Sequence, residues 1–167
     1  MNRLHPLLAA TDLSAPSRHA AQRAAMLARH AGARFELVHV LQKSALDDLR
    51  RLFGKEGEAL MERIRLQSRE ALGQLAADIG APLDVVVGCN LREGPVLETI
   101  IQQADLFDAS LVIVGARGTA YMRHWLLGST AERLLRKTLR PILLVKQPAR
   151  EEYRSVLVPV DFSPWSL

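Results

Sequence analysis

Three glycines and two hydroxyl side chains have the composition and the spacing of a phosphate-binding loop. The glycines are Gly115, Gly118 and Gly128, and Ser129 and Thr130 follow the third glycine directly. Glycine suits such a loop because a Cβ atom would hold an anion away from the backbone N–H groups. We therefore expect these residues to contact a phosphate through backbone amides and hydroxyls.

A strand before this loop and a helix after it would position the glycines. Residues 111–114 are an apolar run typical of a buried strand, and the following segment AERLLRKTL has helical periodicity. Ser129, with Glu132 three residues later, fits a capping box at the start of that helix. Such a junction combines unpaired N–H groups with the positive end of a helix dipole. The alternative, that Gly115 only ends a strand and Gly128 only starts a helix, explains each glycine singly but not the whole set.

The spacing Gly-x2-Gly-x9-Gly-Ser resembles the nucleotide-binding signature of the universal stress proteins, in their ATP-binding branch. Further segments look like family segments in family order: LLAATDLS, FELVHVL, DASLVIVGARG and GSTAERLLRKTLRPILLVK. The resemblance covers nearly the whole chain. It implies an adenine-nucleotide cofactor, ATP or a related nucleotide, in a stress-response regulator that forms a homodimer through its last strand.

The resemblance also assigns positions of this chain to the nucleotide. Ala10, Thr11 and Asp12 would line the nucleotide site, and Val40 would meet the adenine through its main chain. The glycine loop would contact the ribose and phosphates through Gly115, Gly118, Gly128, Ser129 and Thr130. Arg117, between the first two glycines, is placed for a bidentate contact with a phosphate, with an ordinary surface arginine as the alternative.

Asp12 is the carboxylate that stands out, because it follows the first apolar run of the chain. It could accept a hydrogen bond from the adenine or ribose, or help to hold Mg²⁺ beside the phosphates. A helix N-cap before Ala15 is the alternative role. The histidines show no metal-ligand spacing with one another or with Cys89, so we expect no metal site made of protein ligands alone. His39, in an apolar strand, is more typical of a histidine satisfied at a sheet end.

Apolar runs alternate with helical periodicity along the chain. The strands are expected at 6–11, 35–41, 83–87, 111–114 and 141–145, and the helices at 14–29, 47–79 with an interruption near Gly54 and Gly57, 95–107, and after 130. Continuously apolar strands between helices predict an α/β fold, an open five-stranded parallel sheet with helices on both faces, Rossmann-like and similar to the adenine nucleotide alpha hydrolases. Asp12, Val40 and Gly115 would then meet at the carboxyl edge of the sheet.

Composition limits the other classes of function. The 167 residues, 49% of them hydrophobic, suffice for one domain with a proper core. The net charge of +4 is spread along helices and aromatic residues make up only 5%, so the composition argues against nucleic-acid binding. A single cysteine suits a reducing compartment. No apolar run approaches the ~20 residues of a membrane span, and the apolar start is too short for a signal peptide. We expect a cytoplasmic protein without a membrane segment.

The last residues repeat the first strand. VLVPVDFS, residues 156–163, aligns with LLAATDLS, residues 7–14. We therefore expect a universal stress protein domain at 1–147, a linker at 148–154, and at 155–167 the first strand of a second repeat that is cut short, as in a truncated tandem protein. The apolar stretch 156–160 is expected to pair as a strand at an edge, against its own domain or that of a dimer partner.

The sequence favours nucleotide binding over catalysis. Gly54-Lys55 is followed by Glu56, which rules out a P-loop there, and no nucleophile has an evident base. The leading hypothesis is a regulator in which ATP stabilises one conformation or dimer that a partner recognises. A slow ATP hydrolase or nucleotidyl-transfer enzyme of the same architecture, and a nucleotide-free interaction protein, remain the alternatives.

Overall fold

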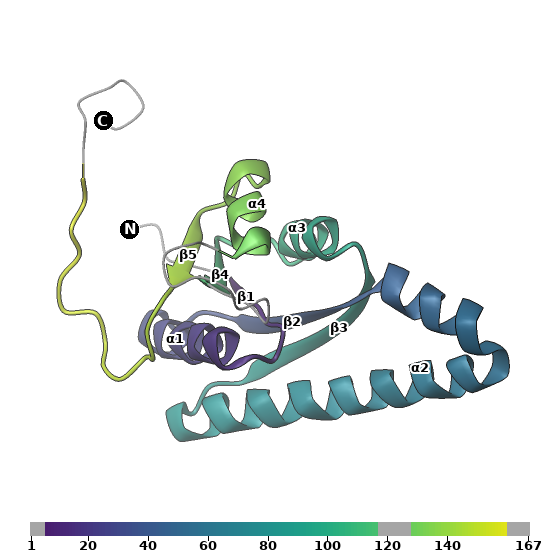
Figure 1. The fold of residues 1–167 in the computed structure, drawn as a ribbon. Helices are drawn as coiled ribbons and strands as arrows, with labels where there is room; N and C mark the ends of the chain where they lie inside the picture. The colour runs from purple at the N-terminus through teal and green to yellow at the C-terminus, as the bar shows by residue number, and fades with distance from the viewer. Residues whose placement is uncertain (1–5, 117–127, 160–167) are drawn as a thin grey trace.

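A computed structural model of the chain describes residues 6–116 and 128–159, in which five strands alternate with helices (Figure 1). The strands are β1 (Leu7–Ala10), β2 (Phe35–Gln42), β3 (Val87–Gly94), β4 (Leu111–Gly115) and β5 (Ile142–Val145). The helices are α1 (Ala15–Ala31), α2 (Lys43–Gly80), α3 (Val96–Leu106) and α4 (Ser129–Lys137), with a short 3-10 turn, η1 (Ala81–Leu83), after α2.

The five strands form one parallel sheet in the order β3-β2-β1-β4-β5. This confirms the expected fold class. The chain builds the sheet from β1 outward through β2 to β3, and then crosses to the other side of β1 to form β4 and β5. The strand order therefore reverses between β1 and β4, which is where open α/β sheets bind ligands at their carboxyl edge.

Helices cover both faces of the sheet and produce two core layers (Figure 1). Along β1, alternate side chains enter opposite layers: Leu7 and Ala9 face α1 and α2, whereas Leu8 and Ala10 face α3 and α4. Helix α1 packs closely on the sheet because most of its buried residues are alanines, at positions 20, 21, 24, 25 and 28. It ends at Gly32, whose φ of 60° is the left-handed conformation of a helix C-cap.

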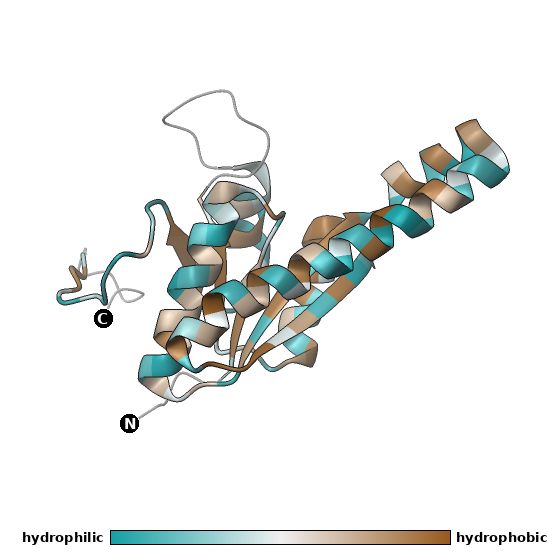
Figure 2. Cartoon of the chain, turned by 90° about the horizontal axis from the view of Figure 1, so that it is seen from below, coloured by the Kyte–Doolittle hydropathy of each residue, from teal (hydrophilic) through white to brown (hydrophobic). Residues whose placement is uncertain are grey.

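Helix α2 continues beyond the sheet as a projecting arm (Figure 2). The expected interruption is confirmed at Gly54, where φ is 54° and ψ is −123°, so the helix folds back on itself. Gly57 then lies against the carbonyl of Leu49, where a Cβ atom would collide with the backbone. The helix begins at Lys43, four residues earlier than the expected start at 47, because it follows β2 directly.

One expectation about local structure was wrong. The third strand is not 83–87 but Val87–Gly94, because the preceding residues form η1 and Asp84 then turns with a φ of 53°. Among the described strands, β3 is an edge strand that pairs only with β2. It carries polar residues, so it lacks the continuous apolar run by which the other strands are predicted. Pro95 is the N-cap of α3 and precedes its first turn. Residues 156–159 form no strand within the single chain, and their pairing with a dimer partner stays a prediction.

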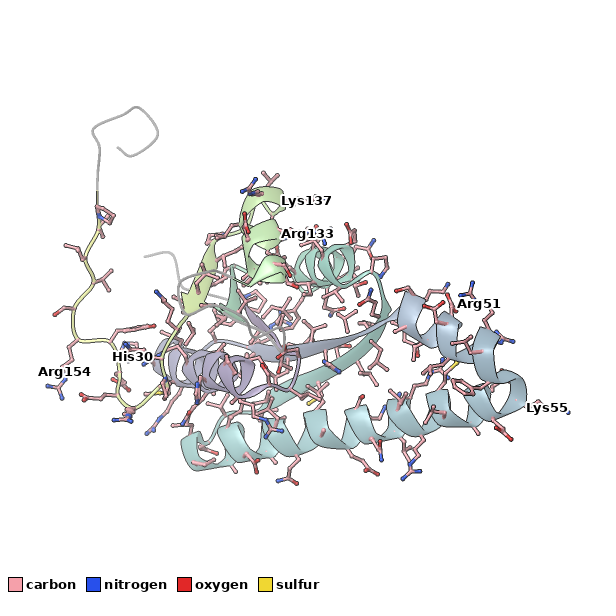
Figure 3. All side chains as sticks on the ribbon, in the orientation of Figure 1. His30, Arg51, Lys55, Arg133, Lys137 and Arg154 are labelled. Carbon is pink, nitrogen blue, oxygen red and sulfur yellow. The ribbon has the colours of Figure 1, made fainter. Side chains whose placement is uncertain are left out.

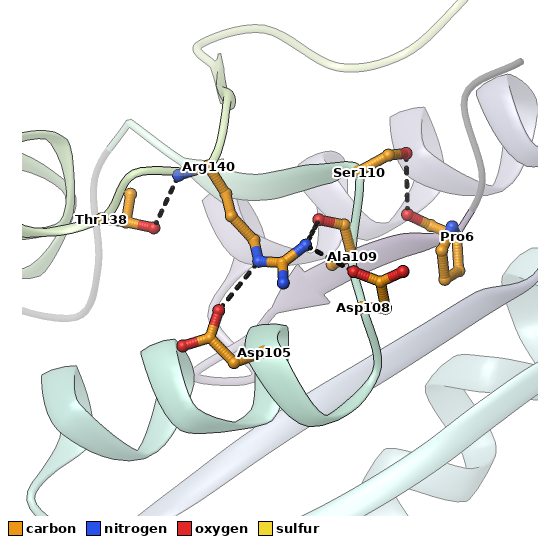
Figure 4. A network of polar contacts seen from close by, with 7 residues as sticks. All are labelled: Pro6, Asp105, Asp108, Ala109, Ser110, Thr138 and Arg140. Atoms are coloured by element: carbon orange, nitrogen blue, oxygen red, sulfur yellow. Dashed lines mark hydrogen bonds and ion pairs between the residues drawn. The ribbon is translucent and has the colours of Figure 1, made fainter. Parts of the chain in front are cut away.

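Arg140 ties the start of β5 to the end of α3 (Figure 4). Its Nε donates to Asp105 Oδ1 at 2.9 Å, and its Nη1 donates to Asp108 Oδ1 at 3.2 Å and to the carbonyl of Ala109 at 2.5 Å. The hydrogen bond to Asp105 raises the pKa of the guanidinium above its usual value. Because these contacts lie at the amino ends of the strands, they fix the sheet while leaving its carboxyl edge to the site.

Within the described parts of the chain, none of the helices combines the length and the apolar content needed to cross a membrane.

Candidate functional site

The carboxyl ends of β1 and β4 lie side by side at the point where the strand order reverses. Ala10 pairs in register with Val114, so Thr11 and Gly115 continue from adjacent strand ends. The N–H of Gly128 donates to the carbonyl of Ala116 at 2.8 Å, which brings the chain and the start of α4 back to the same edge. Residues from the first and last thirds of the domain thus meet in one place.

Helix α4 begins there without a side-chain cap. Gly128 is the N-cap, and no side chain of the described residues bonds to the first N–H groups. The expected capping box is therefore wrong: Ser129 is the first helical residue, and Glu132 instead pairs with Arg136 at 2.7 Å. Ser129 and Thr130 are both exposed, and the first N–H groups of a helix are of the kind that binds an anion when no side chain caps them.

The conformation of Gly128 is one that other residues can adopt. Its φ of −61° and ψ of 141° lie in the extended region. Backbone strain therefore does not explain the glycine at this position. The remaining explanation for the glycine is that it has no side chain, which leaves room for an anion to approach the backbone at the start of the helix.

Thr11 uses its polar atoms to hold the loop between β1 and α1. Its hydroxyl lies 2.9 Å from Ser17 Oγ and accepts from the N–H of Leu13 at 3.0 Å. Its carbonyl accepts a hydrogen bond from His39 Nδ1 at 2.8 Å, which requires the proton on that nitrogen. The side chain is only 6% exposed. Thr11 thus shapes the rim of the site from beneath, and His39 is a satisfied sheet-end histidine, as expected.

Asp12 lies exposed on the same rim and supports the cap of α1. Its Oδ1 accepts from the N–H of Ser14 at 3.1 Å and from the Ser14 hydroxyl at 2.5 Å. The N-cap itself is Ser14, whose oxygen accepts from the N–H of Ser17. The alternative role of Asp12 as the N-cap was therefore wrong by two residues. Leu13, with a φ of 64°, makes the tight turn between them.

Val40 lies on the part of β2 that extends beyond the end of β1. Ala10, at the end of β1, pairs with Val38, so β2 continues past the end of β1 and Val40 extends on the face that also holds Ala10 and Val114. Arg92 of β3 is the register partner of Val40. Two hydrogen bonds link side chains of β3, α3 and β2 nearby. Arg92 Nε donates to Gln103 Oε1 at 3.0 Å, and Gln103 Nε2 donates to Glu36 Oε1 at 2.7 Å.

Sequence reasoning missed this chain of Arg92, Gln103 and Glu36. The only signal was Glu36, an acidic residue within an apolar strand, and it is 9% exposed. Two predicted site residues, Arg117 and Gly118, lie outside the described residues. Within residues 6–116 and 128–159, no three His, Cys, Asp or Glu side chains gather closely enough to hold a metal ion.

Known proteins share both the sequence and the fold. The chain is 29% identical over 143 residues to the universal stress protein MJ0531 of Methanocaldococcus jannaschii, a match that covers 84% of this chain and 81% of that protein. The solved structure of the hypothetical protein MJ0577 superposes with a TM-score of 0.74 at 19% identity, over 87% of this chain and 98% of the other.

Two similar structures contain adenine nucleotides. A universal stress protein from Archaeoglobus fulgidus in complex with dAMP matches with a TM-score of 0.61 and 20% identity, over 87% of this chain and 100% of that chain. A universal stress protein in complex with cAMP matches with a TM-score of 0.63 and 19% identity, over 87% and 98%. At these identities the likeness shows a shared fold. Residues 4–146 match the Universal stress protein family, and the chain belongs to that family.

Proposed function

We propose that the chain binds an adenine nucleotide, ATP foremost, at the carboxyl edge between β1 and β4, and that the bound nucleotide regulates a stress response. One observation carries the proposal: the start of α4, which no side chain of the described residues caps, is joined to the end of β4 at the reversal of strand order. The dAMP and cAMP complexes of similar proteins support adenine as the base.

In this proposal each part of the edge has its own task. The backbone N–H groups of Ser129 and Thr130 bind phosphate oxygens, with Gly115 and Gly128 leaving them room, and Arg117 and Gly118 complete the loop. The adenine lies against Ala10 and the main chain of Val40. The bound nucleotide supplies phosphate charge, which the helix dipole and Mg²⁺ held with the help of Asp12 would balance.

The nucleotide acts as a ligand in this proposal and is not turned over rapidly. Thr11 and Asp12 are the polar side chains closest to the end of β1, and their oxygens already hold Leu13, Ser14 and Ser17. This leaves neither as an evident base or nucleophile. A nucleotide that orders the loop before α4 would stabilise one conformation, and a partner or dimer would recognise that conformation.

Calorimetric titration of the full chain with ATP tests the proposal through Gly128→Val. The extended backbone at this position accepts valine, whereas the new side chain would occupy the space of the anion. We expect affinity to fall at least about tenfold, since one charge-assisted hydrogen bond contributes about 1.5–3 kcal/mol. Gly73→Ala is the matched control, because a Cβ atom there meets nothing within 4 Å on the solvent face of α2. That variant should bind like the wild type.

Other outcomes separate the rival functions. Unchanged affinity in a normally folded Gly128→Val variant, judged by circular dichroism, would refute the phosphate site. Absence of binding by the wild type, with no nucleotide released on denaturation, would favour a nucleotide-free interaction protein. Magnesium-dependent hydrolysis at ~1–1000 per second would mean an enzyme. Repeating the titration of Asp12→Asn in magnesium and in EDTA tests the metal role, which requires the larger loss in magnesium.

A further inference from the structure

The projecting arm of α2 is a hairpin of two helical segments. The first segment runs outward from the end of β2, Gly54 turns the chain, and the second segment returns toward the sheet. The two segments pack closely where Gly57 lies against the carbonyl of Leu49, and the ion pair of Arg50 with Glu58, at 3.7 Å, also joins them. The arm therefore presents one defined end to its surroundings (Figure 2).

The end of the arm carries two adjacent apolar side chains that are exposed. Leu52 is 69% exposed and Phe53 is 54% exposed. The arm buries other apolar residues instead, Leu46 and Met61, which are 4% and 7% exposed. A single exposed leucine is ordinary at a protein surface, but two large apolar side chains together at a projecting end are a feature of interaction sites.

Three cationic side chains surround this apolar pair. Residues 50–55, called here the arm tip, have the sequence RRLFGK and contain no acidic residue. Figure 3 shows Arg51 on the arm and Lys55 at its end, with the Lys55 side chain directed away from the domain. Arg51 pairs with Asp48 at 3.3 Å, but these two side chains are 79% and 61% exposed. Because exposed ion pairs contribute little, the arginine can exchange this carboxylate for another anion.

The position of the apolar pair favours a lipid surface over a protein groove. A groove that binds a helix contacts an apolar stripe with side chains at i, i+3, i+4 and i+7. On the outgoing segment no such stripe is exposed, because Leu46 is buried and Leu49 is half-buried behind the tip. Leucine and phenylalanine enter the boundary between lipid headgroups and acyl chains, whereas arginine and lysine attract anionic headgroups.

We propose that the arm tip binds the surface of a membrane that contains anionic phospholipids. Leu52 and Phe53 enter the interface, and Arg50, Arg51 and Lys55 contact lipid phosphates. Acidic residues follow the tip on the returning segment, at 56 and 58, and limit the attraction of the whole arm. Binding therefore requires the apolar pair and the cations together. This contact is peripheral, and it is independent of nucleotide binding.

Sedimentation of the full chain with vesicles gives the first test. We expect the wild type to bind vesicles of phosphatidylcholine and phosphatidylglycerol in equal parts, and to bind phosphatidylcholine alone much more weakly. Leu52→Ser combined with Phe53→Ser should weaken binding at least about tenfold, because burial of apolar area drives interfacial binding. Leu66→Ser is the matched control, since Leu66 is 55% exposed on the returning segment, and it should bind like the wild type.

A second pair of variants tests the cations. Arg51→Gln combined with Lys55→Gln should bind the mixed vesicles several-fold more weakly and with less dependence on salt. Arg29→Gln combined with Arg69→Gln removes the same charge from exposed positions of α1 and α2 away from the tip, and should bind like the wild type. A wild type that does not bind the mixed vesicles, or equal losses in the tip variants and their controls, would overturn the proposal.

A fluorescent label identifies the part of the arm that enters the lipid. In a Cys89→Ser background, an environment-sensitive fluorophore on Phe53→Cys should shift to the blue with the mixed vesicles, and the same fluorophore on Leu66→Cys should not. Equal shifts would mean that the arm lies flat on the lipid and would refute binding by its tip. Light scattering without lipid tests the other occupant: a smaller mass for Leu52→Ser with Phe53→Ser than for the wild type would mean that a second copy covers the tip, which would also refute the proposal.

Discussion

The same sequence pattern occurs in the molecule in two opposite environments. LLAATDLS contains β1, whose residues 7–10 are 0%, 0%, 0% and 9% exposed between β2 and β4. VLVPVDFS begins with Val156, Leu157 and Val158, which are 79%, 92% and 71% exposed. The pattern therefore encodes the capacity to form a strand, and the neighbouring strands decide whether that capacity is used.

The two copies also differ at the end of the strand, where the first copy builds the candidate site. Thr11, which holds Leu13 and Ser17 through its hydroxyl, is replaced by Val160 in the repeat, and Ala10 by Pro159. A valine has no hydroxyl to support the loop, and a proline has no N–H for a central ladder. Only the first copy thus carries the hydroxyl that supports the candidate site.

The largest effect should come from truncating the aligned leucines of the two copies. Leu8→Ala removes a side chain that is 0% exposed in the layer with α3 and α4, and we expect a loss of about 2–5 kcal/mol in the free energy of unfolding. Leu157→Ala should change that free energy by less than about 0.5 kcal/mol, because Leu157 is 92% exposed within one chain. Urea unfolding measures both.

Both unfolding measurements should be made at protein concentrations where the chain is monomeric, so that contacts between two protein molecules do not contribute to the free energy of unfolding. Comparable losses for Leu8→Ala and Leu157→Ala under those conditions would mean that the tail packs on its own domain. The contrast between a buried first repeat and an exposed second repeat would then be incorrect.

A smaller effect is expected from making the first copy resemble the second at the end of β1. Thr11→Val keeps the shape of the side chain but removes the acceptor for the N–H of Leu13 and the contact with Ser17. We expect unfolding without nucleotide to become easier by about 1–2 kcal/mol, the typical effect of a lost buried hydrogen-bond partner. Thr11→Ser retains the hydroxyl and should lose less. If the two variants were equally stable, the hydroxyl would not be what holds the loop.

Most of the fold could be predicted from the sequence because buried parallel strands are continuously apolar. The expected strands 6–11, 35–41, 111–114 and 141–145 all coincide with β1, β2, β4 and β5 to within about one residue. The third strand could not be placed, because an edge strand needs apolar residues on fewer sides. Sequence periodicity reports burial, and burial is lowest at the edges of a sheet.

The candidate site was only partly predictable. Glycine spacing and strand ends were sufficient to bring Thr11, Gly115 and Gly128 to one edge. Hydrogen-bond partners were not predictable, because they depend on side-chain directions: Ser14 caps α1 in place of Asp12, and Glu132 bonds to Arg136 in place of Ser129. The contact of residues 149–153 with α1 was also not predictable, since Arg23 and Tyr153 are 130 positions apart in the chain.

A local effect, with the domain still folded, is expected where residues 156–158 are attached to the domain. Tyr153→Ala removes the ring that lies 4.1 Å from the Arg23 guanidinium, a contact worth about 0.5–2 kcal/mol. The carbonyl of Glu151 still accepts from Arg23, so the domain should remain folded. Residues 149–153 should leave α1 more often, which exposes the peptide bond after Arg150 to trypsin. We expect the rate of cleavage after Arg150, followed by mass spectrometry over time, to become several-fold faster. Cleavage after Lys55, in the exposed turn of α2, should keep its rate and serves as the internal standard for protease activity.

Tyr153→Phe is the matched control, because it keeps the aromatic ring face, and it should be cleaved like the wild type. Equal rates of cleavage after Arg150 in Tyr153→Ala and the wild type would show that the Tyr153 ring does not hold residues 149–153 against α1. The change from buried to exposed chain would then lie elsewhere in the sequence.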